Sequence, residues 1–395
     1  CLFFSLISSL KPIYIIKGLE DTQIYSRISN PSLYPECPSN TKRIVVKDDK
    51  NFNTNFISRY PNCVAKLFRV HFNTTTGRVE QLPGITTEST SVNNSTFLSD
   101  TFGHTISKIK QLGYKDNINL FSVTYNYFLH PISSFPVYDE LKNKIEKIYS
   151  QTGEKSILIS FNQGSSFISI FLSNYSKPEW VKKYINSIIF YSPTFAGIPS
   201  ISKFLSQTFS PFISNREFKK SLMNMPGLHI SLPNYVVYEN YTLNNLNISQ
   251  IFGFLKDIKK VDDESEKIFK SVAEKYLKSP IPEPIIPSFI INSNKTSEVV
   301  VKPIISVDDD DRYEEAVYIS STYACSHWKS SKCIKTNDFG QFIFEYLNGQ
   351  STISSRIIQK DENLVETFSN DDHLSISGVQ GIYVDSCHVN VHTVN

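Results

Sequence analysis

A five-residue segment near the middle of the chain has the pattern of a turn that presents a nucleophile in acyl-transfer chemistry. Ser160 and Gly164 stand two positions before and two positions after Asn162. In such a turn the central residue has a strained backbone, and its flanks must be small so that a strand and a helix can approach each other. Asn tolerates a positive φ, so the backbone requirement is met. Its carboxamide has no ionisable proton and cannot form an acyl-enzyme, so the chemical requirement is not met.

The segments on both sides are the elements that such a turn needs. Residues 156–160 have the pattern of a buried strand, and residues 165–174 form an apolar helical run. Other short apolar or β-branched runs predict strands, and apolar residues that recur every three or four positions predict helices. The strands are expected at 12–16, 44–46, 65–70, 120–125, 188–191 and 288–291, and the helices at 101–113 and 138–151. Strands that alternate with helices favour an α/β fold with a mostly parallel sheet.

Composition and charge exclude several classes of protein. The chain has 395 residues, of which 40% are hydrophobic and 13% aromatic, so it is not a disordered chain and can bury a large core. The 40 basic and 38 acidic residues nearly cancel, and no nucleic-acid motif is present, so nucleic acid is not an expected partner. No Cys/His spacing is typical of zinc, so no metal is implied. No organic cofactor is implied either. The acidic run 308–311 lacks calcium-ligand spacing and is interpreted as a solvated loop.

The start of the chain and the cysteines favour the secretory pathway. Residues 2–10 are an apolar run too short to span a bilayer, so we interpret residues 1–10 as a signal-peptide remnant, with a buried first strand as the alternative. Cys37 and Cys63 bracket a polar segment that a disulfide would close in an oxidising compartment; two reduced, buried cysteines are the alternative. The pairing of Cys325, Cys333 and Cys387 stays open. Glycosylation acceptors, expected in a secreted or lumenal glycoprotein, occur at Asn73, Asn93, Asn94, Asn174, Asn240, Asn247 and Asn294.

Several segments, in a consistent order, resemble the lecithin:cholesterol acyltransferase and lysosomal phospholipase A family. These are α/β-hydrolases that move acyl chains from phospholipids. The resembling segments, which span most of the chain, are 12–18, 72–76, 82–84, 113–127, 179–185, 192–197 and 241–242. The resemblance implies one α/β-hydrolase domain over residues 11–395, with a mostly parallel sheet flanked by helices. It also implies a disulfide-closed excursion at 36–70, resembling the family's membrane-binding segment, and a cap insertion at about 200–287.

The same resemblance assigns an oxyanion loop that departs from the family pattern. Asn162 stands at the serine position, and Gln163 follows it. The loop itself falls on Gly18, Leu19 and Glu20, where the family has Pro-Gly-x-x-Gly-Ser. An acid in this loop would destabilise a developing oxyanion, which is the reverse of what acyl transfer needs.

The remaining triad positions also depart from the family. The acid motif aligns best with residues 337–342, which leaves Asp338 one position out of register. His388 resembles the family's histidine turn after the last strand, and His373 is the alternative. These departures predict a lecithin:cholesterol acyltransferase-like protein, with the fold of an O-acyltransferase or phospholipase, that is catalytically inactive and binds a phospholipid or acyl lipid.

Two other functions are kept open. One is an active phospholipid acyltransferase or phospholipase A that uses an unrecognised nucleophile. The other is a secreted interaction protein without a lipid function. Docking to a membrane through the excursion is expected to be weak or absent, because residues 38–62 lack Trp and a contiguous apolar face.

Overall fold

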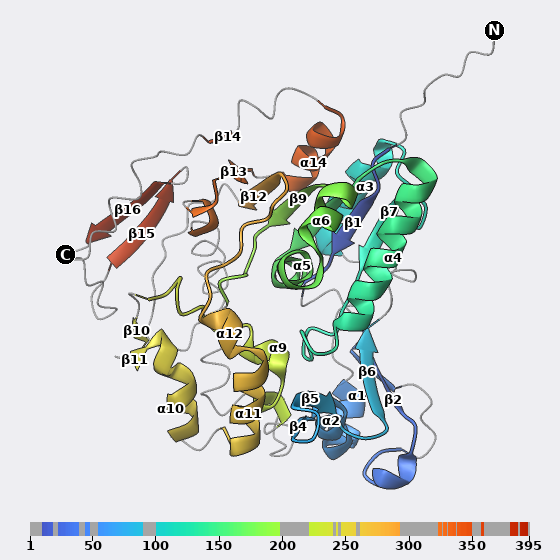
Figure 1. Ribbon diagram of the computed structural model, residues 1–395, viewed down its shortest axis with the longest axis vertical. Coiled ribbons are helices and arrows are strands. Elements are labelled where there is room, and N and C mark those ends of the chain that lie inside the picture. The colour runs from blue at the N-terminus through green and yellow to red at the C-terminus, as the bar shows by residue number, and fades with distance from the viewer. Residues whose placement is uncertain are drawn as a thin grey trace.

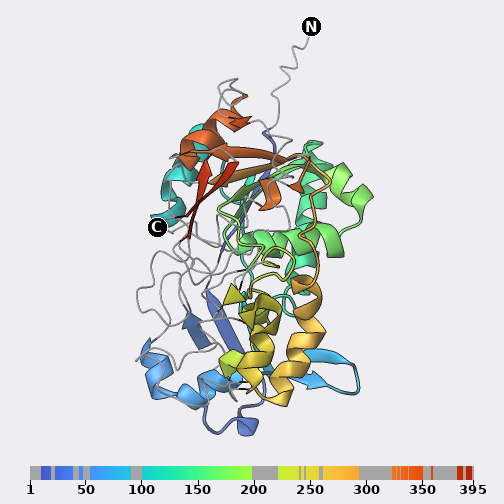
Figure 2. The ribbon, with the colours of Figure 1, turned by 90° about the vertical axis from the view of Figure 1, so that its left-hand side faces the viewer.

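A seven-stranded sheet forms the centre of the molecule (Figure 1). The structure, a computed structural model, describes residues 10–18, 23–38, 44–47, 54–89, 100–197, 221–239, 242–243, 246–257, 261–292, 323–325, 327–329, 331–336, 338–349, 357–358, 380–385 and 388–393. The proposed signal-peptide remnant, the acidic run 308–311 and Cys387 lie outside these residues, apart from Leu10. The sheet and its helices occupy one half of the molecule. The smaller elements of the expected excursion and cap occupy the other half (Figure 2).

Six strands of the sheet are parallel, and the edge strand β14 is antiparallel. The strand order is β14-β13-β12-β9-β8-β1-β7. The strands are β1 (Ile13–Ile16), β7 (Leu120–Val123), β8 (Ser156–Phe161), β9 (Ile185–Tyr191), β12 (Ser288–Asn292), β13 (Ser331–Lys335) and β14 (Ile357–Ile358). The prediction of a mostly parallel sheet flanked by helices is confirmed.

Strand β1 shows how a central strand buries both of its faces. Tyr14 and Ile16 belong to one hydrophobic cluster, and Ile13 and Ile15 belong to another, because successive side chains point to opposite faces. The first cluster includes side chains of α4 (Phe135–Thr152) and α5 (Gly164–Ile170). The second includes side chains of α3 (Asp100–Gln111) and α14 (Phe339–Leu347). Helices therefore bury both faces of the sheet.

A disulfide-closed excursion follows the first strand, as the resemblance implied. Cys37 and Cys63 are bonded, with an S–S distance of 2.02 Å. The excursion contains β3 (Ile44–Lys47), α1 (Thr54–Arg59) and α2 (Pro61–Phe68), and β3 joins the flanking strands β2 (Ile24–Ile28) and β6 (Ile85–Ser89) in a small antiparallel sheet. The strand predicted at 65–70 is wrong over most of its length, because α2 continues to Phe68. Pro61 starts this helix, and its apolar residues bury one face.

Within the described residues, four short helices with defined bounds lie in the interval expected for a cap. They are α9 (Pro226–His229), α10 (Ile251–Asp257), α11 (Asp263–Val272) and α12 (Glu274–Leu277). The remaining elements are η1 (Pro31–Leu33), β4 (Val70–Asn73), β5 (Arg78–Gln81), the π-helical turn η2 (Phe171–Tyr175), α6 (Pro178–Tyr184), β10 (Thr242–Leu243), β11 (Leu246–Asn247), η3 (Ile248–Gln250), β15 (Gln380–Asp385) and β16 (His388–Thr393). A second disulfide, which the sequence did not predict, joins Cys325 to Cys333. Within the described ranges, no helix is both long enough and apolar enough to span a bilayer.

Candidate active site

The turn between β8 and α5 has the backbone geometry of a nucleophile elbow. Asn162 has a φ of 48°, the left-handed conformation that such a turn imposes on its central residue. A Cβ atom at Gly164 would lie 2.8 Å from the carbonyl oxygens of both Ile16 and Lys17. Only glycine fits at this distance, so the small flank predicted from the sequence is required by the contact between α5 and the end of β1. The elbow is therefore present as a structure.

The three neighbouring parallel strands β1, β8 and β9 end at the same edge of the sheet as this turn. Residues that are distant in sequence therefore lie close together there. In the sheet register, Ser160 of β8 lies beside Ile16 of β1, and Phe161 lies beside Tyr191 of β9. The residues that follow each strand therefore meet at one edge, where ligands bind in open α/β sheets. A Cβ atom at Gly18, in the predicted oxyanion loop, would lie 3.3 Å from the Cβ of Asn162. Leu19 and Glu20 of that loop lie outside the described residues.

Asn162 is held by residues that follow β9 and begin α5. The hydroxyl of Thr194 donates to Asn162 Oδ1 at 3.3 Å. The Ser165 hydroxyl donates to the Asn162 carbonyl and accepts the Thr194 backbone N–H at 3.1 Å. Thr194 and Ser165 are buried, whereas Asn162 is partly exposed. The sequence analysis missed Thr194 as a site residue; its position just after β9 was the available signal.

Gln163 connects the elbow to the cap. Its side-chain amide nitrogen donates to the hydroxyl of Ser231, and that hydroxyl donates to the Gly227 carbonyl at 2.7 Å. A Cβ atom at Gly227 would overlap the backbone carbonyl of Tyr127, so α9 packs directly on the loop that follows β7. Gln163, which the resemblance assigns to the oxyanion site, therefore binds the cap through its side chain.

Asp338 uses its carboxylate to begin a helix. It is the N-cap of α14, and its Oδ1 accepts the backbone N–H of Gln341 at 2.8 Å. The same oxygen lies 3.3 Å from Nε2 of His104 on α3. The Gln341 hydrogen bond, followed by the neighbouring His104, lowers the pKa of this half-exposed carboxyl. The contacts of Asp338 are thus with α14 and α3, on the face of the sheet that carries the second hydrophobic cluster.

The two histidines considered from the sequence are not brought to the elbow by any described contact. His388 begins β16, which pairs with β15 in a hairpin that is separate from the central sheet (Figure 1). His373 lies outside the described residues. In the described ranges, no group of three or more His, Cys, Asp or Glu side chains could hold a metal ion.

A buried serine–histidine contact occurs elsewhere, before α4. Nδ1 of His130 lies 2.7 Å from the hydroxyl of Ser134. Both residues are buried, and burial lowers the pKa of His130 to about 3, so the imidazole is neutral at physiological pH. Because both side chains are enclosed by the protein, we assign this pair to the anchoring of the loop rather than to catalysis.

The stretch that carries the elbow is similar to a known protein family. Residues 51–210 match the lecithin:cholesterol acyltransferase family. This stretch includes β7, β8, the elbow and β9. The match agrees with the resemblance drawn from the motifs. No curated protein matches the chain in sequence.

Solved structures align with this chain at low sequence identity. A chain of the Tle4–Tli4 complex aligns over 84% of this chain and 92% of its own, with a TM-score of 0.46 and 11% identity. The monoacylglycerol lipase of Paleococcus ferrophilus aligns over 64% of this chain and 90% of its own, with a TM-score of 0.26 and 14% identity. Phospholipase PlaB of Legionella pneumophila aligns over 57% of this chain and 41% of its own, with a TM-score of 0.30 and 11% identity.

Proposed function

We propose that this protein binds an acyl lipid through the fold of a lipid acyltransferase, without transferring the acyl chain. The observation that carries the proposal is Asn162, at a φ of 48° in the position of the nucleophile. A carboxamide cannot form the ester intermediate on which acyl transfer in this fold depends. The family match over residues 51–210 supports a phospholipid as the class of ligand.

The hydrogen bonds around Asn162 suggest how binding replaces attack. Because its Oδ1 accepts the Thr194 hydroxyl, the side chain presents its amide nitrogen to a ligand. The amide nitrogen is a hydrogen-bond donor. The next residue, Gln163, has a backbone N–H that is a second donor. Two donors at this edge suit the carbonyl oxygen of a lipid ester. The site would therefore hold the carbonyl group that an active enzyme would attack.

The nearest hydroxyl groups are poor substitutes for the missing nucleophile. Ser165 donates to the Asn162 carbonyl, and Thr194 donates to the Asn162 side chain. Both residues are buried, and a general base is not among their described partners. Loss of a triad serine costs on the order of 10⁶ in turnover, so residual acyl transfer should fall to background.

A covalent probe tests the absence of catalysis. The purified protein should not be labelled by a fluorophosphonate reagent under conditions that fully label a known serine hydrolase. It should also release no fatty acid from phosphatidylcholine vesicles. Labelling that is lost when one particular serine is changed to alanine would identify an active nucleophile and refute the proposal.

Lipid occupancy tests the binding half of the proposal. Lipids extracted from the purified protein should contain a phospholipid or acyl lipid in stoichiometric amount by mass spectrometry. Asn162→Asp removes the amide donor and adds a negative charge beside the lipid carbonyl, so occupancy should fall. Asn117→Asp makes the same change at another left-handed residue, with a φ of 61°, on an exposed loop and should leave occupancy unchanged. Equal occupancy in both variants would place any lipid elsewhere.

We further propose that the protein follows the secretory route. The disulfides Cys37–Cys63 and Cys325–Cys333 support this, because such bonds persist in oxidising compartments. Recovery of the mature protein from culture medium, with both disulfides intact by mass spectrometry, is the expected result.

A further inference from the structure

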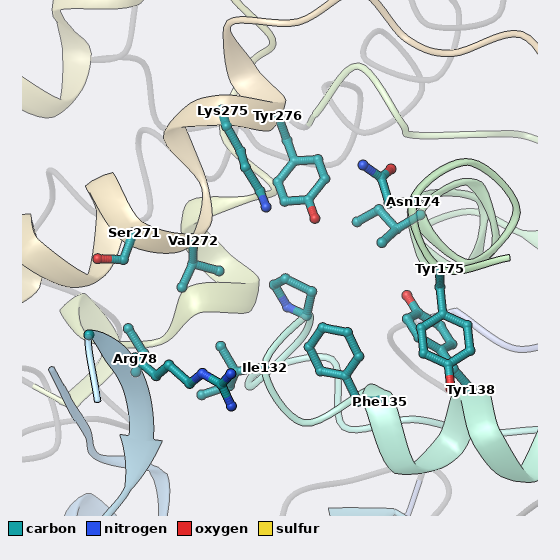
Figure 3. Close-up of a pocket in the computed structure, with 14 residues that line it drawn as sticks. Arg78, Ile132, Phe135, Tyr138, Asn174, Tyr175, Ser271, Val272, Lys275 and Tyr276 are labelled. Atoms are coloured by element: carbon teal, nitrogen blue, oxygen red, sulfur yellow. The ribbon is translucent and has the colours of Figure 1, made fainter. Parts of the chain in front are cut away.

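A pocket lies among elements that are distant in sequence (Figure 3). Its walls come from the turn before β5, the start of α4, the end of α5 with the π-helical turn, and the helices α11 and α12. Its volume is about 690 Å³, which is within the range of ligand pockets. Asn162, Gln163 and Thr194 are not among its lining residues. The pocket is therefore a separate site.

The charge of this pocket is positive. Arg78 enters from β5, and Lys275 enters from α12 on another wall (Figure 3). No aspartate or glutamate is among the residues described as lining the pocket. The ammonium group of Lys275 lies 4.8 Å from the ring centroid of Tyr276, a position that orients the cation. Both cations face the same space, so they favour an anionic group that enters the pocket.

The remaining walls are mainly apolar and aromatic. Phe135 is 55% exposed, which is unusual for so large an apolar side chain, and Ile132 and Val272 lie beside the same space. The hydroxyl of Tyr138 donates to the Phe167 carbonyl at 3.0 Å, and the hydroxyl of Tyr175 donates to Asp139. These two tyrosines therefore contribute ring surface to the pocket rather than hydrogen-bond donors.

We propose that this pocket binds a single-chain anionic amphiphile of the fatty-acid type. The carboxylate would lie between Arg78 and Lys275, and the acyl chain would cover Phe135, Ile132 and Val272. A free phosphate would satisfy the cations but leave Phe135 in water. A neutral lipid would cover the apolar wall but would bring no anion to Arg78 and Lys275. Only a ligand with both parts complements both kinds of wall. This proposal does not rest on lipid binding at the elbow.

Titration with laurate, below its critical micelle concentration, tests the proposal on the full-length protein. Isothermal calorimetry should detect one binding site. The double variant Arg78→Gln/Lys275→Gln should weaken binding by at least about tenfold, since each hydrogen bond to a charged group contributes enough for such a loss. Lys267→Gln removes one positive charge from an exposed position of α11 outside the pocket, and it should leave the affinity unchanged. Dodecanol, which lacks the anion, should bind at least about tenfold more weakly than laurate.

A blocking variant separates this pocket from the elbow. Ser271 is exposed on α11 and lines the pocket, so Ser271→Trp should fill the space without disturbing the core. It should abolish laurate binding, whereas Asn162→Asp should not change it. The inference is wrong if Ser271→Trp or the double variant binds laurate as tightly as the parent. It is also wrong if inorganic phosphate or ATP displaces laurate at equal concentration, because the site would then recognise the anion alone.

Discussion

The turn after β8 and the turn after β13 stand at the same edge of the sheet, but different kinds of contact determine their structures. After β8 the backbone is that of a nucleophile elbow, with Asn162 at a φ of 48° and Gly164 pressed against the end of β1. After β13 a carboxylate is present, but Asp338 caps α14 and faces His104. The first turn keeps the geometry without the reactive group, and the second keeps an acidic group in a different role.

The difference follows from what maintains each feature. The elbow is maintained by close packing of main-chain atoms, and any larger residue at Gly164 would disturb the contact between two core elements. The direction of a carboxylate depends on the partners of one side chain, and a helix N-terminus offers several N–H groups as partners. Geometry held by the core is therefore hard to change, whereas a surface side chain readily takes another role.

The largest effect is expected at Gly164. In Gly164→Ala, the new Cβ would lie 2.8 Å from two backbone carbonyl oxygens, which cannot move without shifting β1. The free energy of unfolding should fall by about 3 kcal/mol, as for an overpacked core position. Gly103→Ala is the control, because it adds a methyl group in α3 where no atom lies within 4 Å. Chemical denaturation of both variants measures the difference. Equal stability would mean that the elbow is not held by this contact.

A smaller effect is expected from the left-handed backbone of the elbow. Asn162→Val should destabilise the protein by about 1–2 kcal/mol relative to Asn162→Gly, because a β-branched residue is strained at positive φ. The same pair of substitutions at Asn117, whose φ is 61°, should give a similar difference. If the Asn162→Val and Asn162→Gly variants are equally stable, the turn relaxes to accept valine. The contrast between the turns after β8 and β13 would then be wrong.

At Asp338 the expected effect is about 1 kcal/mol, the usual contribution of an N-cap. Asp338→Ala should be destabilised by this amount at pH 7, and Asp338→Asn, which keeps an acceptor, should be destabilised less. Since the folded-state pKa of Asp338 is lowered, its charge stabilises the fold above the unfolded pKa, and this stabilisation is lost as the pH falls through the folded value. The difference between Asp338→Ala and the parent should therefore shrink in acid. Unfolding measured between pH 7 and pH 3 tests this.

The smallest effect is expected on activity. Asn162→Ser should fold, because serine is accepted in an elbow, yet it should not release fatty acid from phosphatidylcholine above background. An attacking serine needs an oriented histidine and acid, and the carboxylate of Asp338 is engaged by α14 and His104. A fatty-acid release assay, run beside an active serine hydrolase, provides the measurement. Strong turnover from this single change would show that a working acid and histidine are already in place.

Much of the core could be predicted because its signals are local. The strand at 12–16 and the helix at 138–151 correspond to β1 and α4, and the small flanks of Asn162 predicted the elbow. The strand predicted at 65–70 was wrong over most of its length, because a short segment with Leu, Phe and Val does not reveal that Pro61 has already started a helix. The Cys325–Cys333 bond was left open, since spacing does not determine which cysteines meet.

The sequence by itself determined that a strand, a left-handed residue and a helix follow one another at Asn162, and that the central side chain is not a nucleophile. Both facts depend on residue type and near neighbours. Only the tertiary structure decided that Thr194 binds Asn162, that Gln163 reaches the cap, and that Arg78 and Lys275 face one pocket. These contacts join residues far apart in the chain. They depend on the strand order and on how the insertions pack, which no local pattern encodes.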